Sequence, residues 1–171
     1  MRGAQLILAC GLAAGLLPAQ TAADLFDGER LVVHPSDWAK LQQNYQDNTY
    51  YPANLTWRSI TIANVGIRSK GRTSRRNTKP GLRVDMDRFE EQRFLGLKSF
   101  LLDNNIQDYT MIKERLAMLL YRRMGLPAPR ESHCRLFVNN TYLGVYTIVE
   151  STDKLALKNW FREDEGYLYE Y

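Results

Sequence analysis

Residues 110–150 read TMIKERLAMLLYRRMGLPAPRESHCRLFVNNTYLGVYTIVE, and this stretch decides the fold class that the sequence predicts. Apolar side chains recur on one face with helical spacing, which predicts a helix over Thr110–Met124. That face consists of Ile112, Leu116, Leu119 and Leu120. Gly125 is a typical residue after a helix end, and the prolines at 127 and 129 prevent continuation. The pattern therefore predicts one long helix with a defined end.

Strands are predicted on both sides of this helix. Downstream, Cys134–Val138 and Tyr142–Glu150 flank Asn139-Asn140, a dipeptide that favours a hairpin turn. The resulting order is strands, one long helix, a hairpin and a short helix. It predicts an α+β fold in which a mainly antiparallel sheet carries the packed long helix, as in the small lobe of a protein kinase. The other expected elements are strands at Leu31–Val33, Leu55–Arg68 (two strands, with a turn at Ala63-Asn64), Leu82–Met86 and Leu97–Leu102, and helices at Pro35–Asn44 and Asp153–Phe161.

The composition indicates one globular domain, because the chain has 171 residues, of which 44% are apolar and 25% charged. The N-terminus follows the order of a secretory signal peptide, with Arg2, an apolar run over Ala4–Leu17 and the small residues Thr21–Ala23. We expect cleavage near Ala23, which leaves a domain over 24–171 without a transmembrane segment, in an exported or cell-envelope location. Cys134 would then be the only cysteine, so no internal disulfide is expected.

Positive charge is concentrated in one stretch. Between Asn48 and Val84 there are eight basic residues and no acidic one, although the net charge of the whole chain is only +4. This local excess indicates an anionic partner at one place. Within it, Gly66–Arg76 combines two glycines, hydroxyl side chains and cations, a set that can bind a polyphosphate. A solvated basic loop is the alternative interpretation, and no Walker A motif is present.

Three further positions are candidates for chemistry, each with an ordinary structural alternative. Glu114 could pair with a strand cation or simply favour the N-terminus of its helix. Glu150 ends an apolar strand, either beside a ligand or as a strand-end charge. Asp103–Asn105 supplies oxygens that suit Mg²⁺, but such turns are common without a metal. Neither His-Arg-Asp nor Asp-Phe-Gly occurs in the chain, so the catalytic pair of kinase chemistry is not recognisable.

Six stretches follow one another along the chain: NVGIRSKG (64–71), KPGLRV (79–84), GLK (96–98), MGLPAPR (124–130), YLGVYTIVE (142–150) and Asp153-Lys154. In this order and spacing they resemble the spore coat protein H (CotH) kinase-like family over about Leu25–Tyr171. The resemblance implies a kinase-like fold, of which this chain would hold the small lobe and the start of the large lobe. It also implies ATP and Mg²⁺ as cofactors and serine residues of exported proteins as substrates.

The resemblance also implies roles for individual residues. Glu114 would orient a phosphate-binding cation, and Glu150 would lie at the hinge near adenine. The choice between Lys79 and Arg83 as the main phosphate ligand stays open. The phosphate side would consist of Arg68, Lys70, Arg72, Ser74, Lys79 and Arg83.

Two departures from the family pattern bear on activity. The family's catalytic and metal-binding aspartates would lie beyond Tyr171, and its usual Gly-Asn-Ser-Ser-type loop reads GRTS at 71–74. We therefore expect a fragment that at most binds nucleotide. The alternatives are a non-catalytic spore-coat-like or surface structural or adhesion protein, and a nucleic-acid binder driven by the basic stretch. Export and the lack of interleaved aromatic residues over Lys70–Arg83 argue against nucleic acid.

Overall fold

The computed structural model describes residues 28–167 and 169, so the predicted signal peptide over residues 1–23 lies outside the described part. None of the described helices has both the length and the apolar character that crossing a bilayer would require. The elements are β1 (Gly28–Val33), α2 (Pro35–Gln43), β2 (Tyr51–Trp57), β3 (Ile60–Ser69), β4 (Leu82–Asp85), β5 (Ser99–Asp103), α3 (Lys113–Arg123), β6 (Glu131–Val138), β7 (Thr141–Glu150) and α4 (Lys154–Phe161).

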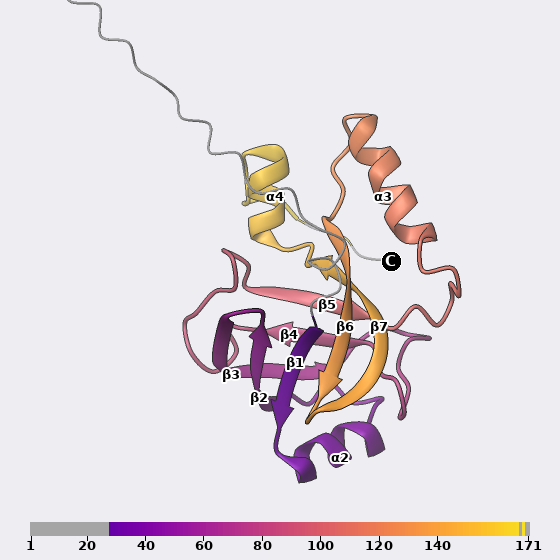
Figure 1. The fold of residues 1–171 in the computed structure, drawn as a ribbon. Coiled ribbons are helices and arrows are strands. Elements are labelled where there is room, and N and C mark those ends of the chain that lie inside the picture. The colour runs from indigo at the N-terminus through magenta and orange to yellow at the C-terminus, as the bar shows by residue number, and fades with distance from the viewer. Residues whose placement is uncertain (1–27, 168, 170–171) are drawn as a thin grey trace, which may run out of the picture.

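The strands form one closed barrel in the order β1-β2-β3-β4-β5-β7-β6. Neighbouring strands run antiparallel except at the seam, where β1 pairs with β6 in parallel. The turn after β6 fastens this seam, because the backbone N–H of Val33 donates to Asn139 Oδ1 at 2.9 Å. Figure 1 shows α2 across one end of the barrel, while α3 and α4 project from the other end.

The core lies inside the barrel and follows the two-residue alternation of its strands. In β4, Leu82 and Val84 point inward and are fully buried, whereas Arg83 and Asp85 point outward and are half-buried. Leu41 of α2 is also buried and packs on the core cluster. The outward faces of the strands are therefore the surface on which a site can form.

The predicted fold class, a kinase-like small lobe with a long helix packed on an open sheet, is wrong. The structure is a closed seven-stranded barrel, and α3 contains no buried residue. Leu116, which was predicted to pack on the sheet, is 63% exposed. In a closed barrel the apolar inner faces of the strands cover one another, so the sheet does not need a packed helix to bury its apolar side. Local alternation does not reveal the pairing of β1 with β6 that closes the barrel.

Local predictions had mixed outcomes. The hairpin around Asn139-Asn140 is confirmed, and both residues have positive φ angles of 48° and 65°, as a tight hairpin turn requires. The turn predicted at Ala63-Asn64 is wrong, because β3 continues through these residues and the chain turns between Trp57 and Ile60. Asn64 has φ 55° beside a register shift between β2 and β3, so its turn-like character marks a β-bulge.

Candidate functional site

The basic loop between β3 and β4, residues 70–81, is folded against itself. The backbone N–H of Lys70 donates to the carbonyl of Gly81, and the N–H of Gly81 donates to the carbonyl of Ser74, both at 2.8 Å. From outside the loop, the buried side chain of Asn104 donates from Nδ2 to the same Ser74 carbonyl at 2.9 Å. These bonds give the loop a defined shape.

Two glycines permit this shape. Gly71 has a φ of +108°, and a Cβ at this position would lie 1.7 Å from Ser74 Oγ. A Cβ on Gly81 would lie 2.8 Å from the carbonyl oxygen of Lys70. Residues with a Cβ rarely adopt the first conformation and do not fit the second, so both positions require glycine.

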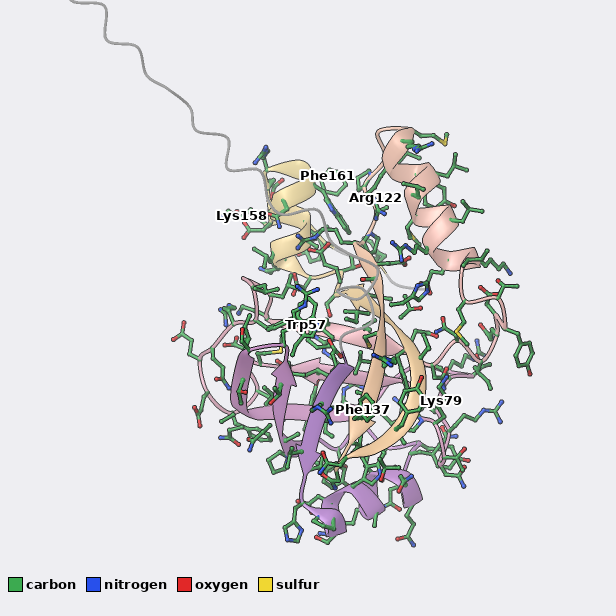
Figure 2. All side chains as sticks on the ribbon, in the orientation of Figure 1. Trp57, Lys79, Arg122, Phe137, Lys158 and Phe161 are labelled. Carbon is green, nitrogen blue, oxygen red and sulfur yellow. The ribbon has the colours of Figure 1, made fainter. Side chains whose placement is uncertain are left out.

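Lys79, one of the predicted phosphate ligands, bonds to the protein's own backbone. Its Nζ donates to the carbonyls of Asn104 and Val145, each at 3.0 Å, and lies 4.9 Å from the centroid of the Tyr146 ring. Burial lowers the pKa of Lys79, although the nearby Asp103 carboxylate acts in the opposite direction. Figure 2 shows Lys79 beside the curved β7 strand. This lysine therefore holds the end of the barrel together.

Arg68 is also engaged, whereas Arg72 is exposed on the loop. Arg68 Nη1 donates to Asn48 Oδ1 and to the carbonyl of Ser69, both at 3.0 Å, and the guanidinium lies 5.4 Å from the centroid of the Tyr50 ring. Arg68 thus ties β3 to the segment that precedes β2. The cations predicted to bind phosphate therefore do not form one cluster: Arg68 and Lys79 bond to other groups of the protein, whereas Arg72 is exposed.

Lys70 and Ser74 line a cleft between the loop, β5 and α3. Asp103 at the end of β5 and Glu114 in the first turn of α3 line the same cleft. The space continues along α3 as a cavity of about 410 Å³ that shares Ser74, Asp103 and Glu114. Within the described residues no ion pair joins Lys70 to Glu114. A predicted cation, a predicted hydroxyl and the predicted glutamate therefore meet in one place.

Arg83 lies on the outward face next to the floor of this cleft. Its strand register places it beside Leu101 of β5, which in turn lies opposite Val149 of β7, and both apolar side chains line the cleft. Arg83 Nη2 donates to Ser99 Oγ at 2.9 Å, whereas its Nε is buried and has no hydrogen-bond partner among the described residues. The outward face therefore carries the Arg83 guanidinium, which makes only part of its possible hydrogen bonds, next to the apolar side chains of Leu101 and Val149.

Carboxylates gather on the α3 side of the same face. Burial, followed by repulsion from Glu114, raises the pKa of Glu131 to about 7, and in the part of the chain that the structure describes neither of its carboxylate oxygens has a hydrogen-bond partner. Burial, followed by repulsion from Asp103, also raises the pKa of Glu114. The sequence analysis missed Glu131, because a glutamate that follows an arginine at a strand start looks like an ordinary surface ion pair. The face is therefore basic at the loop and acidic under α3.

Glu150 lies at the end of β7, is buried, and forms an ion pair with Arg130. Arg130 Nη2 donates to Oε1 at 2.9 Å, and its Nε and backbone N–H both donate to Oε2 at 3.1 Å. This ion pair links the segment 125–130 to β7. Two of the sequence motifs that carry the family resemblance, at 124–130 and 142–150, are therefore in contact here. The role of Glu150 near adenine stays a prediction.

The Asp103–Asn105 turn uses its oxygens inside the protein. Asp103 Oδ1 accepts the backbone N–H of Asn105 at 2.6 Å, and Asn105 Oδ1 accepts the hydroxyl of Thr147 at 2.9 Å. Across residues 28–167 and 169, no group of three or more His, Cys, Asp or Glu side chains is placed to hold a metal ion.

Comparison with known families gives a match over the part of the chain that carries this cleft. The family described as CotH kinase protein matches residues 67–171, which is more than half of the chain. The match includes the basic loop, the α3 helix and the β6–β7 hairpin. A comparison with curated proteins found no significant match.

Proposed function

Since this chain belongs to the CotH kinase protein family, we propose that it contributes the nucleotide-phosphate side of an ATP-dependent kinase. The proposed substrates are serine hydroxyls of exported or surface proteins. The observation that carries the proposal is the cleft in which Lys70 and Ser74, from a loop that requires its glycines, face Asp103 and Glu114. In protein kinases a glycine-rich loop covers the nucleotide phosphates, and a nearby lysine binds them.

The chemistry of the cleft fits a nucleotide tail. Lys70 and Ser74 would contact phosphate oxygens, because an ammonium group and a hydroxyl donate to such acceptors. Arg83 lies beside Leu101 of the cleft floor, where its positive charge would attract the phosphates. The apolar side chains of Leu101 and Val149 offer a dry surface to the less polar part of the nucleotide.

The carboxylates of the cleft fit a magnesium–nucleotide complex better than a free nucleotide. Asp103 and Glu114 would repel bare phosphate, whereas oxygen ligands and bridging waters suit Mg²⁺. ATP supplies the γ-phosphoryl group, and Mg²⁺ neutralises its charge. The chain's own residues would bind and orient this complex from the barrel side. An N-terminal signal peptide would place the activity outside the cytoplasm.

Nucleotide titration tests the proposal. Binding of ATP with Mg²⁺ is measured by calorimetry for the chain and for the variants Lys70→Ala and Arg83→Ala. Because a hydrogen bond to a charged group contributes about 1.5–3 kcal/mol, each variant is expected to bind about tenfold to a hundredfold more weakly. Lys40→Ala is the matched control, since Lys40 is an exposed cation of α2 that pairs with Asp37 and does not line the cleft. Unchanged affinity in both cleft variants would refute the phosphate site.

A non-catalytic surface or coat protein is the second candidate function. It is favoured by the use of Arg68 and Lys79 in contacts with the protein's own groups, which leaves fewer cations for a ligand. A chain that binds no nucleotide with Mg²⁺, yet unfolds cooperatively, would support this function over the first.

A further inference from the structure

The side of α3 that faces away from the barrel is apolar and uncovered. Ile112 is 56% exposed, Leu116 63%, Leu119 39% and Leu120 55%. Their spacing of four, three and one residues places them along one side of the helix. We call these four residues, together with Arg123, the α3 outer face. No residue of α3 is buried, so in this chain the helix does not use this face for packing.

Within α3 itself, every charged group on or beside the outer face is a cation, whereas the Asp108 carboxylate lies at the start of the helix and accepts the backbone N–H of Lys113 at 2.8 Å. Arg123 follows Leu116 by seven residues and therefore lies within the apolar row. Lys113 lies on one flank and Arg115 and Arg122 on the other, where Arg115 contacts His133 and Arg122 donates to the carbonyl of Pro129. Glu114, the single acidic residue of α3, lines the cleft toward the barrel instead. The outer face thus combines apolar surface with an excess of positive charge, and its one neighbouring carboxylate, Asp108, lies at the N-terminal end.

Helix α4 adds groups of the same kind at the same end of the molecule. Both helices project from this end of the barrel (Figure 1), and Figure 2 shows Phe161 and Lys158 on α4. Phe161 is 59% exposed, and the segment Lys154–Arg162 contains three cations and no acidic residue. The apolar and cationic character is therefore a property of this end of the molecule, although acidic residues follow at 163–165.

We propose that the α3 outer face docks on an anionic phospholipid surface. An amphipathic helix with Leu and Ile on one side and Lys and Arg around them binds the boundary between lipid headgroups and acyl chains. The position of Arg123 fits a lipid surface. Arg123 is the last residue of α3 and lies at the end of the apolar row, so in a membrane its long side chain can reach lipid phosphates while the apolar side chains before it contact the acyl boundary. The proposal does not depend on the proposed kinase function.

Vesicle co-sedimentation tests this inference. The protein used is residues 24–171, because the apolar segment before Ala23 could bind lipid by itself and every residue of the core cluster lies between Leu31 and Tyr146. Vesicles of phosphatidylcholine and phosphatidylglycerol in equal parts are compared with vesicles of phosphatidylcholine alone. We expect binding to the anionic vesicles only, and its loss at high salt, where charge attraction is screened.

Matched variants locate the contact. Arg123→Glu is expected to weaken binding at least about fivefold, because it removes one cation near the anionic surface. Leu116→Ser combined with Leu120→Ser is expected to weaken it about tenfold or more, because two apolar side chains are lost from the contact. Lys40→Glu on α2 and Arg76→Glu on the basic loop each change charge by the same amount as Arg123→Glu and should change binding little. Melting temperatures close to that of the unchanged chain verify that the variants are folded.

Three results would overturn the inference. They are equal sedimentation with neutral and anionic vesicles, a loss of binding in Arg76→Glu but not in the α3 variants, and no binding to either vesicle. If vesicles do not bind but polyglutamate shifts the fluorescence of the chain in a manner abolished by Arg123→Glu, the face recognises an acidic protein segment instead.

Discussion

Glu29 provides a sharp test of the barrel interior, because it is a carboxyl group with no access to water. It lies in β1 and is 0% exposed, opposite Trp57 of β2 and Leu136 of β6. Glu29 Oε2 accepts a hydrogen bond from the Cys134 thiol, with 3.7 Å between Sγ and Oε2. Oε1 has no hydrogen-bond partner in the described structure. Burial raises the pKa of Glu29 from 4.5 to about 8, against a smaller lowering by the thiol. We therefore expect a neutral Glu29 in the folded chain at pH 7.

The raised pKa has a definite sign for stability. The folded state holds the Glu29 proton more tightly than the unfolded state, so the contribution to the free energy of unfolding is complete below pH 4.5. It falls as pH rises toward about 8, by about 1.4 kcal/mol for each pH unit. Over this window the loss approaches about 5 kcal/mol, an upper value because a buried site relaxes. A domain of this size is commonly stable by about 5–15 kcal/mol, so the effect is large.

Urea unfolding between pH 5 and pH 9 measures this slope in the chain and in Glu29→Gln, whose amide does not ionise. The free energy of unfolding should fall with pH in the unchanged chain, and the variant should lose most of that slope and become the more stable protein at pH 9. Glu131→Gln is the control for the other raised carboxyl group, whose pKa is about 7. An unchanged chain whose stability does not fall between pH 5 and pH 8, or a Glu29→Gln variant that keeps the full slope, would refute a buried neutral carboxyl group.

Other consequences can be checked in the same chain. Glu150→Gln leaves the Arg130 guanidinium without its carboxylate, and we expect the free energy of unfolding to fall by about 1–3 kcal/mol in a urea titration. Gly71→Ala should lower both the melting temperature and the affinity for ATP, whereas Gly125→Ala, which also has positive φ but no atom within 4 Å, should affect the melting temperature alone. Burial raises the pKa of Cys134, so iodoacetamide should label it only in denaturant; rapid labelling of Cys134 itself in the folded chain, located by peptide mass mapping, would show an open barrel interior.

Features set by neighbours in the sequence could be predicted. The β6–β7 hairpin follows from Asn139-Asn140, because asparagine tolerates the positive φ that the turn needs. Helix α4 begins where expected, and Asp153 caps it by accepting the backbone N–H groups of Leu155 and Ala156 at 2.9 and 3.1 Å. These outcomes depend on a few adjacent residues, so the sequence carries them directly.

Features set by distant contacts could not be predicted. The apolar row of α3 indicated a packed helix, yet amphipathic spacing specifies only that a face is apolar and not what covers it. The meeting of Lys70 and Glu114 in one cleft could be predicted, because the sequence indicates both the basic loop and the helix that carry them. The burial of Glu131 and Glu29 could not be predicted, because it depends on strand register and on closure of the barrel.

The seam of the barrel also has a consequence for how the chain folds. It joins residues 106 positions apart, as in the bond from Val33 to Asn139, so the first strand to be synthesised is among the last to complete its pairing. Such long-range pairing is slow to form, and until β6 arrives the free edge of β1 can recruit strands of other molecules. Newly made chains should therefore benefit from a chaperone that shields this edge. A chain that stopped before Val138 would be prone to aggregate.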